Sequence, residues 1–156
     1  METTINALYD VKLEKECIDY VANVADELDS IAAEIMFKCP KCKKVFSLED
    51  VDCSDSTVDR KITCPGCKRK SALKDIEQYE MWDYFEDCYD IEYHITGNNE
   101  YRSVCVTIAY GGPNVYVDTK SGDVELYWAG IQARHGLSKN ARNAIDDYFE
   151  DTYDDM

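Results

Sequence analysis

Two Cys-x-x-Cys pairs are the residues of this chain that point most directly to chemistry. Cys39-Pro40-Lys41-Cys42 and Cys64-Pro65-Gly66-Cys67 are separated by 21 residues, 43–63. Two tight turns that each present a pair of sulfurs from one side match the tetrahedral ligand set of a structural zinc ion. The spacing predicts a zinc ribbon with one structural Zn²⁺, whose ligands are Cys39, Cys42, Cys64 and Cys67.

A redox dithiol is the alternative for such a motif, but it needs a single copy between a strand and a helix, so two copies favour a metal. Cys53 lies inside the ribbon loop and is a competing ligand. The N-terminus lacks a secretory signal, which favours reduced thiols in the cytoplasm. No apolar run is long enough for a membrane span.

The charge of the chain is strongly negative and unevenly distributed. The formal net charge is −15, yet residues 34–74 carry ten bases and six acids, while 75–100 carry nine acids and no base. This pattern predicts a basic zinc module inside an acidic body. We expect an N-terminal helix of the core domain over 1–37, a zinc ribbon insert over 38–70 and an α+β core domain over 71–156. An acidic body of this kind repels nucleic acid and is attracted to basic protein surfaces.

Helices are predicted in three places. Apolar residues at three- and four-residue steps indicate one long helix from about 11 to 36. Its expected buried stripe is Ile18, Val21, Val24, Ala25, Leu28, Ile31, Ala32 and Ile35. Ser71 is expected to cap a second helix over 72–87, in which Ile76, Tyr79, Trp82 and Phe85 repeat every three residues. Ser138 is expected to cap a last helix whose apolar side is Ala141, Ala144, Ile145, Tyr148 and Phe149.

Strands are indicated where the apolar period changes to two. The four expected strands are Tyr89–Ile95, Val104–Ile108, Val115–Val117 and Val124–Trp128. In the first of them, Tyr89, Ile91, Tyr93 and Ile95 are expected to face the core. The fold class predicted is α+β: an antiparallel four-stranded meander with flanking helices and an inserted Cys₄ zinc ribbon. Residues 130–136 are expected to form a functional loop.

The acidic side chains have a spacing that could imitate a polynucleotide. Alternate residues on one strand face stand about 6.5 to 7 Å apart, so Asp90 and Glu92 match successive phosphates. Glu86 and Asp87 precede them, and Asp83 lies earlier in the expected helix. We predict that Asp83, Glu86, Asp87, Asp90 and Glu92 bind a partner as a DNA mimic. The alternative is a solvated acidic face with no partner.

The last third of the chain carries a resemblance. Tyr110-Gly111-Gly112-Pro113-Asn114-Val115-Tyr116-Val117-Asp118-Thr119, followed by Val124-Glu125-Leu126-Tyr127-Trp128, resembles small acidic proteins carried by phages and plasmids of Gram-positive bacteria. Some of these are implicated in anti-CRISPR or anti-restriction activity. The resemblance covers roughly residues 101–155, leaves out the zinc ribbon and brings no catalytic residue with it. It implies an inhibitor in the cytoplasm of a bacterial host, whose partner is a nucleic-acid-binding host defence complex.

Two other functions stay open. A zinc-ribbon interaction or regulatory module could contact nucleic acid or a protein through Lys68, Arg69 and Lys70, although no aromatic platform for base stacking is interleaved with these bases. A small nuclease could use Arg134 and His135 beside Asp118. The usual catalytic motifs are missing from the sequence, so a non-enzymatic binding protein is expected.

Overall fold

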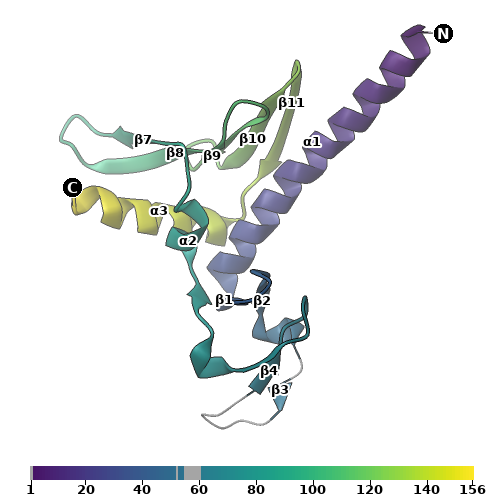
Figure 1. Cartoon of the computed structure of the whole chain (residues 1–156). Coiled ribbons are helices and arrows are strands. Elements are labelled where there is room, and N and C mark those ends of the chain that lie inside the picture. Colours follow the sequence, from purple (N-terminus) through teal and green to yellow (C-terminus); the bar gives the residue numbers. More distant parts are fainter. Residues whose placement is uncertain (1, 52, 55–60) are drawn as a thin grey trace.

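The computed structural model describes residues 2–51, 53, 54 and 61–156, with side chains described for 11–49, 51 and 61–156. The chain consists of a long N-terminal helix, a small module that contains the four cysteines, and a body in which helices cover one face of a sheet (Figure 1). The predicted α+β class with antiparallel sheets is therefore confirmed.

Helix α1 (Glu2–Ala33) is longer than predicted and begins nine residues earlier than the expected position 11. Its buried face consists of Leu13, Cys17, Val21, Val24, Ala25 and Leu28. Two members of the predicted stripe lie outside this face, since Ile18 is 51% exposed and Ile35 is 63% exposed. The predicted stripe is confirmed at its centre, and Leu13 and Cys17 extend the buried face toward the N-terminus.

The body contains a five-stranded antiparallel meander, one strand more than predicted. In order along the sheet, the strands are β11 (Ile131–Gly136), β10 (Asp123–Trp128), β9 (Asn114–Asp118), β8 (Tyr101–Ala109) and β7 (Asp90–Ile95). The expected functional loop 130–136 is therefore wrong. Ala129 and Gly130 both have positive φ, of 49° and 79°, and form a tight turn that lets β11 pair with β10.

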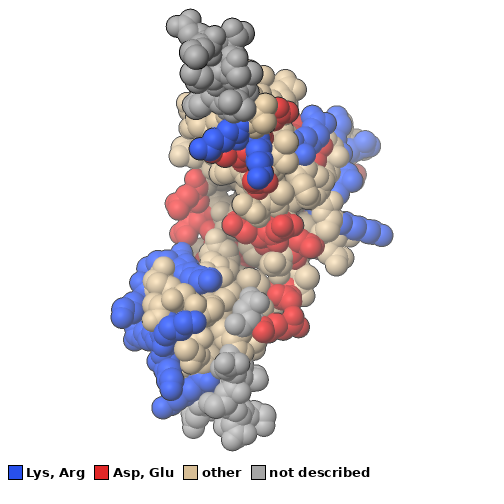
Figure 2. All heavy atoms as spheres, turned by 90° about the vertical axis from the view of Figure 1, so that its right-hand side faces the viewer, with Lys and Arg blue, Asp and Glu red and all other residues tan. Residues whose placement is uncertain are grey.

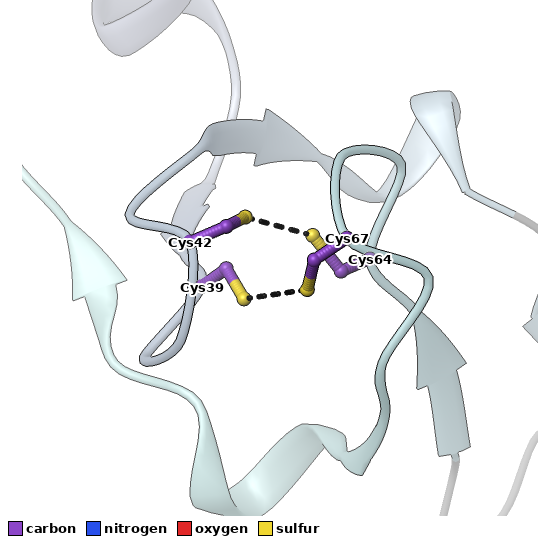
Figure 3. A group of neighbouring side chains, drawn as sticks. All are labelled: Cys39, Cys42, Cys64 and Cys67. Carbon is purple, nitrogen blue, oxygen red and sulfur yellow. Dashed lines mark hydrogen bonds between the residues drawn. The ribbon is translucent and has the colours of Figure 1, made fainter.

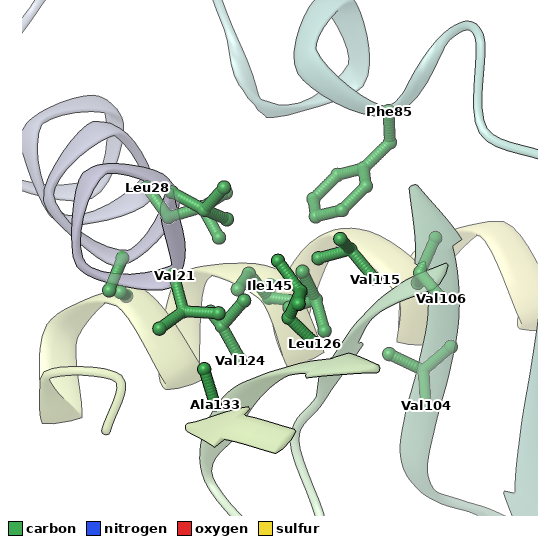
Figure 4. Close-up of a cluster of buried hydrophobic side chains, with 14 of the residues drawn as sticks. Val21, Leu28, Phe85, Val104, Val106, Val115, Val124, Leu126, Ala133 and Ile145 are labelled. Carbon is green, nitrogen blue, oxygen red and sulfur yellow. The ribbon is translucent and has the colours of Figure 1, made fainter. Parts of the chain in front are cut away.

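The core lies between the sheet and the helices. Helix α3 (Lys139–Asp154) begins at the predicted cap, where the Ser138 hydroxyl oxygen accepts a hydrogen bond from the Ala141 N–H at 3.0 Å. Valines and leucines of the strands meet α1, α3 and the short helix α2 (Met81–Phe85) in one cluster (Figure 4). One face of the sheet is thus buried, and the side chains that alternate with this core lie on the opposite, outer face.

The cysteine module follows α1 and has a small core of its own. One three-stranded sheet joins β2 (Val45–Ser47), β1 (Met36–Lys38) and β6 (Gln78–Tyr79). The other joins β3 (Cys53–Ser54), β4 (Lys61–Thr63) and β5 (Lys70–Ala72), and the short 3₁₀ turns η1 (Leu48–Asp50) and η2 (Leu73–Asp75) follow β2 and β5. The buried residues of the module are Phe37, Cys39, Phe46, Ile62, Cys64 and Ile76.

The predicted helix over 72–87 is wrong: within it, Leu73–Asp75 form a 3₁₀ turn and Met81–Phe85 form the short α-helix α2. The apolar residues of that repeat lie in three different environments. Ile76 is buried in the module, Phe85 is buried in the body and Trp82 is 48% exposed. A helix over the whole segment would also bring many acids onto neighbouring turns, with Lys74 as the one base to compensate them. The segment instead forms β6, whose register pairs Met36 with Tyr79.

Candidate metal centre and acidic surface

The four predicted metal ligands lie together at one point of the module. The Sγ atoms of Cys39 and Cys67 are 3.7 Å apart and those of Cys42 and Cys64 are 3.5 Å apart (Figure 3). All four sulfurs lie within 4.8 Å of one another. A tetrahedral ion with metal–sulfur bonds of about 2.3 Å needs sulfurs about 3.8 Å apart, whereas a disulfide needs about 2.05 Å. The cluster is compatible with one tetrahedral metal ion.

Two turns of the same geometry present these sulfurs. The Lys43 N–H donates to the Cys39 carbonyl at 3.0 Å, and the Lys68 N–H donates to the Cys64 carbonyl at 3.0 Å. Lys43 and Lys68, each directly after the second cysteine of its pair, have φ of 66° and 64°. These left-handed residues reverse the chain, so each turn returns to its strand after placing two thiols.

Backbone amides favour the thiolate at two of the four cysteines, whereas at Cys42 the Lys44 N–H is outweighed by burial and the neighbouring thiols, and the net pKa of Cys42 is raised. The Cys42 N–H lowers the pKa of Cys39 to about 6. Burial raises the pKa of Cys64, but the N–H groups of Cys67 and Gly66 outweigh it, and the net pKa of Cys64 is lowered. The Gly66 N–H lies 3.3 Å from the Cys64 sulfur. Because the thiolate is the form that binds metal, the module favours the ligand state of both cysteines.

The remaining cysteines stand apart from this cluster. Cys17 lies on the buried face of α1, and Cys88 and Cys105 are partly buried in the body. The side chain of Cys53, the competing ligand, lies outside the described residues. Four cysteines therefore form the metal-ligand cluster within the described part of the chain.

A band of cations covers the module (Figure 2). Its exposed members are Lys38, Lys41, Lys43, Lys44, Lys61, Lys68, Arg69 and Lys70. Lys38 also lies over the Tyr79 ring, 5.7 Å from its centroid. No ion pair joins any of these eight cations to an acid among the described residues. The predicted basic module is present, and its charges face solvent.

The five predicted partner-binding acids divide into two groups. Asp83, Glu86 and Asp87 lie on or directly after α2. Burial raises the pKa of Tyr79, and the charges of Asp83, Glu27, Glu86 and Asp87 add to this effect. Asp83 also has a structural role, since its carboxylate accepts the Glu80 N–H at 2.8 Å where α2 begins. Asp90 and Glu92 belong to β7.

Acids of both groups affect the thiol of Cys88. Burial raises the pKa of Cys88, and the charges of Asp90 and Asp87 raise it further. One carboxylate from each group thus acts on the same thiol. Asp87 and Asp90, which flank Cys88 in sequence, therefore lie near each other.

The strand register places further acids beside Asp90 and Glu92 on the outer face of the sheet. One row pairs Glu92 with Cys105, Cys105 with Asp118 and Asp118 with Asp123. The next row consists of Asp90, Thr107, Tyr116, Glu125 and Arg134. Burial, and then the charges of Asp118, Glu92, Glu125 and Asp90, raise the pKa of Cys105 to about 11. Five carboxylates and one arginine therefore share the outer face.

The carboxylates of β7 are the accessible part of this face. Asp123 is buried, and Arg134 pairs with Asp123 at 3.4 Å and with Glu125 at 3.1 Å. Asp118 accepts the Lys120 N–H at 2.8 Å in the turn after β9. Asp90 and Glu92 are exposed and retain most of their capacity to meet an external cation; Glu92 lies 3.6 Å from His94 Nε2.

A hollow of about 410 Å³ adjoins these two acids, and sequence reasoning missed the tyrosines that line it. Its lining residues are Tyr89, Asp90, Glu92, Cys105, Thr107, Tyr110 and Tyr116. Tyr89 was expected to face the core, but it is 66% exposed, and its ring centroid is 6.5 Å from that of Tyr110. The ring lies outside because Tyr89 precedes the first residue of β7, where strand alternation no longer applies.

The residues of the alternative nuclease site are dispersed. Arg134 and His135 are consecutive residues of β11, so they point to opposite faces of the sheet. His135 Nδ1 is 3.0 Å from the Gly136 carbonyl oxygen, and Arg134 is held by its two acidic partners. Asp118 is the last residue of β9, and its carboxylate accepts the Lys120 N–H. These three side chains do not share a site.

Comparisons with known proteins found no match for this chain. No protein-family model, no curated protein and no solved structure matches the chain. Among the described residues, no helix combines the length and the apolar character needed to cross a membrane, and this includes the 32-residue helix α1.

Proposed function

We propose that this protein is a non-enzymatic, zinc-containing binding protein that inhibits a partner by occupying its cationic nucleic-acid site. The observation that carries the proposal is the placement of Asp90 and Glu92 on an open sheet face beside a tyrosine-lined hollow. An arginine or lysine of a nucleic-acid-binding cleft can pair with these carboxylates and stack on the rings. Asp83, Glu86 and Asp87 are included in the proposed partner-binding surface.

The class of partner comes from the resemblance of residues 110–119 and 124–128 to acidic anti-defence proteins. Proteins that grip DNA or RNA do so with basic channels, and most of their affinity is electrostatic. A negative strip with carboxylates about 6.5 to 7 Å apart along β7 uses the same attraction. We propose a host defence complex of this kind as the target, which makes the protein a phage or mobile-element inhibitor.

Zinc is the metal proposed for the cysteine cluster. Four thiolates at tetrahedral spacing suit Zn²⁺, and a closed set of four protein ligands leaves no open position for catalysis. The ion would hold the two turns together and so maintain the module that follows α1. Its proposed role is structural.

Capture of a partner from a bacterial lysate tests the proposal. Immobilised protein should retain a nucleic-acid-binding complex, and added duplex DNA or RNA should elute it. Asp90→Lys with Glu92→Lys should abolish capture, because the reversed charges repel a cationic cleft. Asp147→Lys with Asp151→Lys is the matched control, since both residues are exposed on α3.

Equal capture by the two double variants would show that the acidic face of β7 is not the contact. Zinc content and thermal melting should match those of the unchanged protein in both variants. Retention that nucleic acid cannot reverse would also contradict the proposal.

A second candidate function rests on the eight exposed cations of the module, none of which forms an ion pair with an acid in the described ranges. Such a surface could contact phosphates directly. Replacing Lys68, Arg69 and Lys70 by Gln should then remove binding of a labelled duplex at low salt. Absence of any such binding by the unchanged protein would remove this candidate.

A further inference from the structure

A second hollow, of about 570 Å³, has a lining unlike that of the acidic face. Its lining residues are His94, Ile95, Thr96, Gly97, Arg102, Ser103, Lys120 and Arg142. They come from the end of β7, the start of β8, the turn between β9 and β10, and the first turns of α3. Segments that are distant in sequence thus bring three cations to one place.

This gathering of positive charge is unusual for the body of this protein. Residues 75–156 contain only five cations: Arg102, Lys120, Arg134, Lys139 and Arg142. Three of the five line the hollow. None of these three forms an ion pair with an acid in the described parts of the chain, whereas Arg134 has two acidic partners.

The guanidinium of Arg142 is held in position by the turn between β9 and β10. Arg142 Nη2 donates a hydrogen bond to the Lys120 carbonyl at 3.2 Å. Gly122, with φ of 77°, leaves room for this arrangement, because a Cβ at that position would lie 3.3 Å from Arg142 Nη1. Only one guanidinium nitrogen is used in this bond, so the remaining N–H groups stay available to a ligand.

Polar groups complete the hollow beside the cations. The hydroxyl of Thr96 accepts the N–H groups of Asn98 and Glu100, each at 3.2 Å, which leaves its own hydrogen free to donate. Ser103 and His94 share a hydrogen bond of 2.9 Å between Oγ and Nδ1. The lining therefore combines three cations with a free hydroxyl donor.

We propose that this hollow binds the phosphate group of a small phosphorylated molecule. Two guanidinium groups and one ammonium group match the several oxygens of a phosphate better than the two of a carboxylate. A long polyanion is disfavoured, because Glu92 lies 3.6 Å from the His94 ring and the Asp118 carboxylate binds the Lys120 N–H. The site differs from the acidic face, and its occupant would have the opposite charge.

An NMR titration tests the site with defined probes. Inorganic phosphate added to the isotope-labelled, zinc-loaded protein should shift the amide signals of residues 94–97, 102–103, 120–122 and 142. Lys120→Gln should weaken this binding at least about threefold, and the further change Arg102→Gln should abolish it. Lys139→Gln removes an equal charge from α3 outside the hollow and should leave the affinity unchanged.

The possible outcomes distinguish a nucleotide from a phosphate group alone, and both from a failure of the proposal. Tighter binding of adenosine monophosphate than of phosphate, with no binding of adenosine, indicates a nucleotide; equal affinities indicate the phosphate group alone. Equal weakening by Lys120→Gln and Lys139→Gln would show an adventitious ion only and overturn the proposal. Shifts confined to the basic module would overturn it as well, and neither result depends on partner capture by Asp90 and Glu92.

Discussion

Amide groups around the cysteine cluster set the state of two of the four proposed ligands. The Cys42 N–H holds the pKa of Cys39 near 6, and the Cys67 and Gly66 N–H groups lower that of Cys64 despite its burial. The turns thus favour, at these two cysteines, the thiolate form that binds a cation. The four sulfurs lie close enough together to share a single ion. Folding of the module and uptake of zinc should be one event.

Cys39→Ser should change the zinc content from one ion per chain to none, because three thiolates no longer close the tetrahedral shell. Native mass spectrometry measures this directly. Amide exchange should become fast in the module and stay slow in the body, which has a separate core. Cys88→Ser is the control, and a full equivalent of zinc in Cys39→Ser would contradict the assignment.

The pKa of Cys105, and with it the reactivity of the thiol, depends on the charges of the outer face. Since burial and four carboxylates raise the pKa of Cys105 to about 11, only about one thiol in a thousand is ionised at pH 8. Its alkylation by iodoacetamide should therefore speed up about tenfold per pH unit until about pH 11. Glu92→Gln removes one negative charge, lowers the pKa of the thiol and should accelerate the reaction at pH 8.

Peptide mapping by mass spectrometry gives the rate at Cys105 alone. Asp147→Asn on α3 is the matched control and should leave that rate unchanged. A rate that levels off near pH 8.5 would mean that the outer face is not the negative surface described.

At the scale of elements, the sequence predicted those parts whose pattern reflects a single environment. The centre of α1, the hairpin of β9 and β10 and the cap of α3 agree with prediction, because each faces one core. The segment 72–87 does not, since its apolar residues are divided between two clusters and the solvent. Strand β11 was missed because only Ala133 is buried among its six residues.

Leu28 and Ile18, both on α1, offer a direct test of this packing. Leu28 is fully buried, so Leu28→Ala should lower the free energy of unfolding by about 2–5 kcal/mol. Ile18→Ala should cost much less, because that side chain is 51% exposed. Urea unfolding monitored by circular dichroism measures both. Similar losses for the two variants would place the buried face of α1 elsewhere.

At the scale of the whole molecule, charge is segregated between a basic module and an acidic body. Composition alone predicted this division, and the spacing of the cysteines predicted the ligand cluster. The tyrosines beside Asp90 and Glu92 could not be predicted, because they reach that place through strand pairing and a turn. The cationic hollow was missed for the same reason, since its three cations are up to 40 residues apart.

Competition for the nucleic-acid site of the captured partner tests the central claim most directly. The purified partner would be loaded with a fluorescent duplex, and the protein would be added while anisotropy is measured. The account predicts that the duplex is released with a stoichiometry of one protein per site, and that the Asp90→Lys, Glu92→Lys variant releases none. A stable ternary complex of partner, duplex and protein would contradict it.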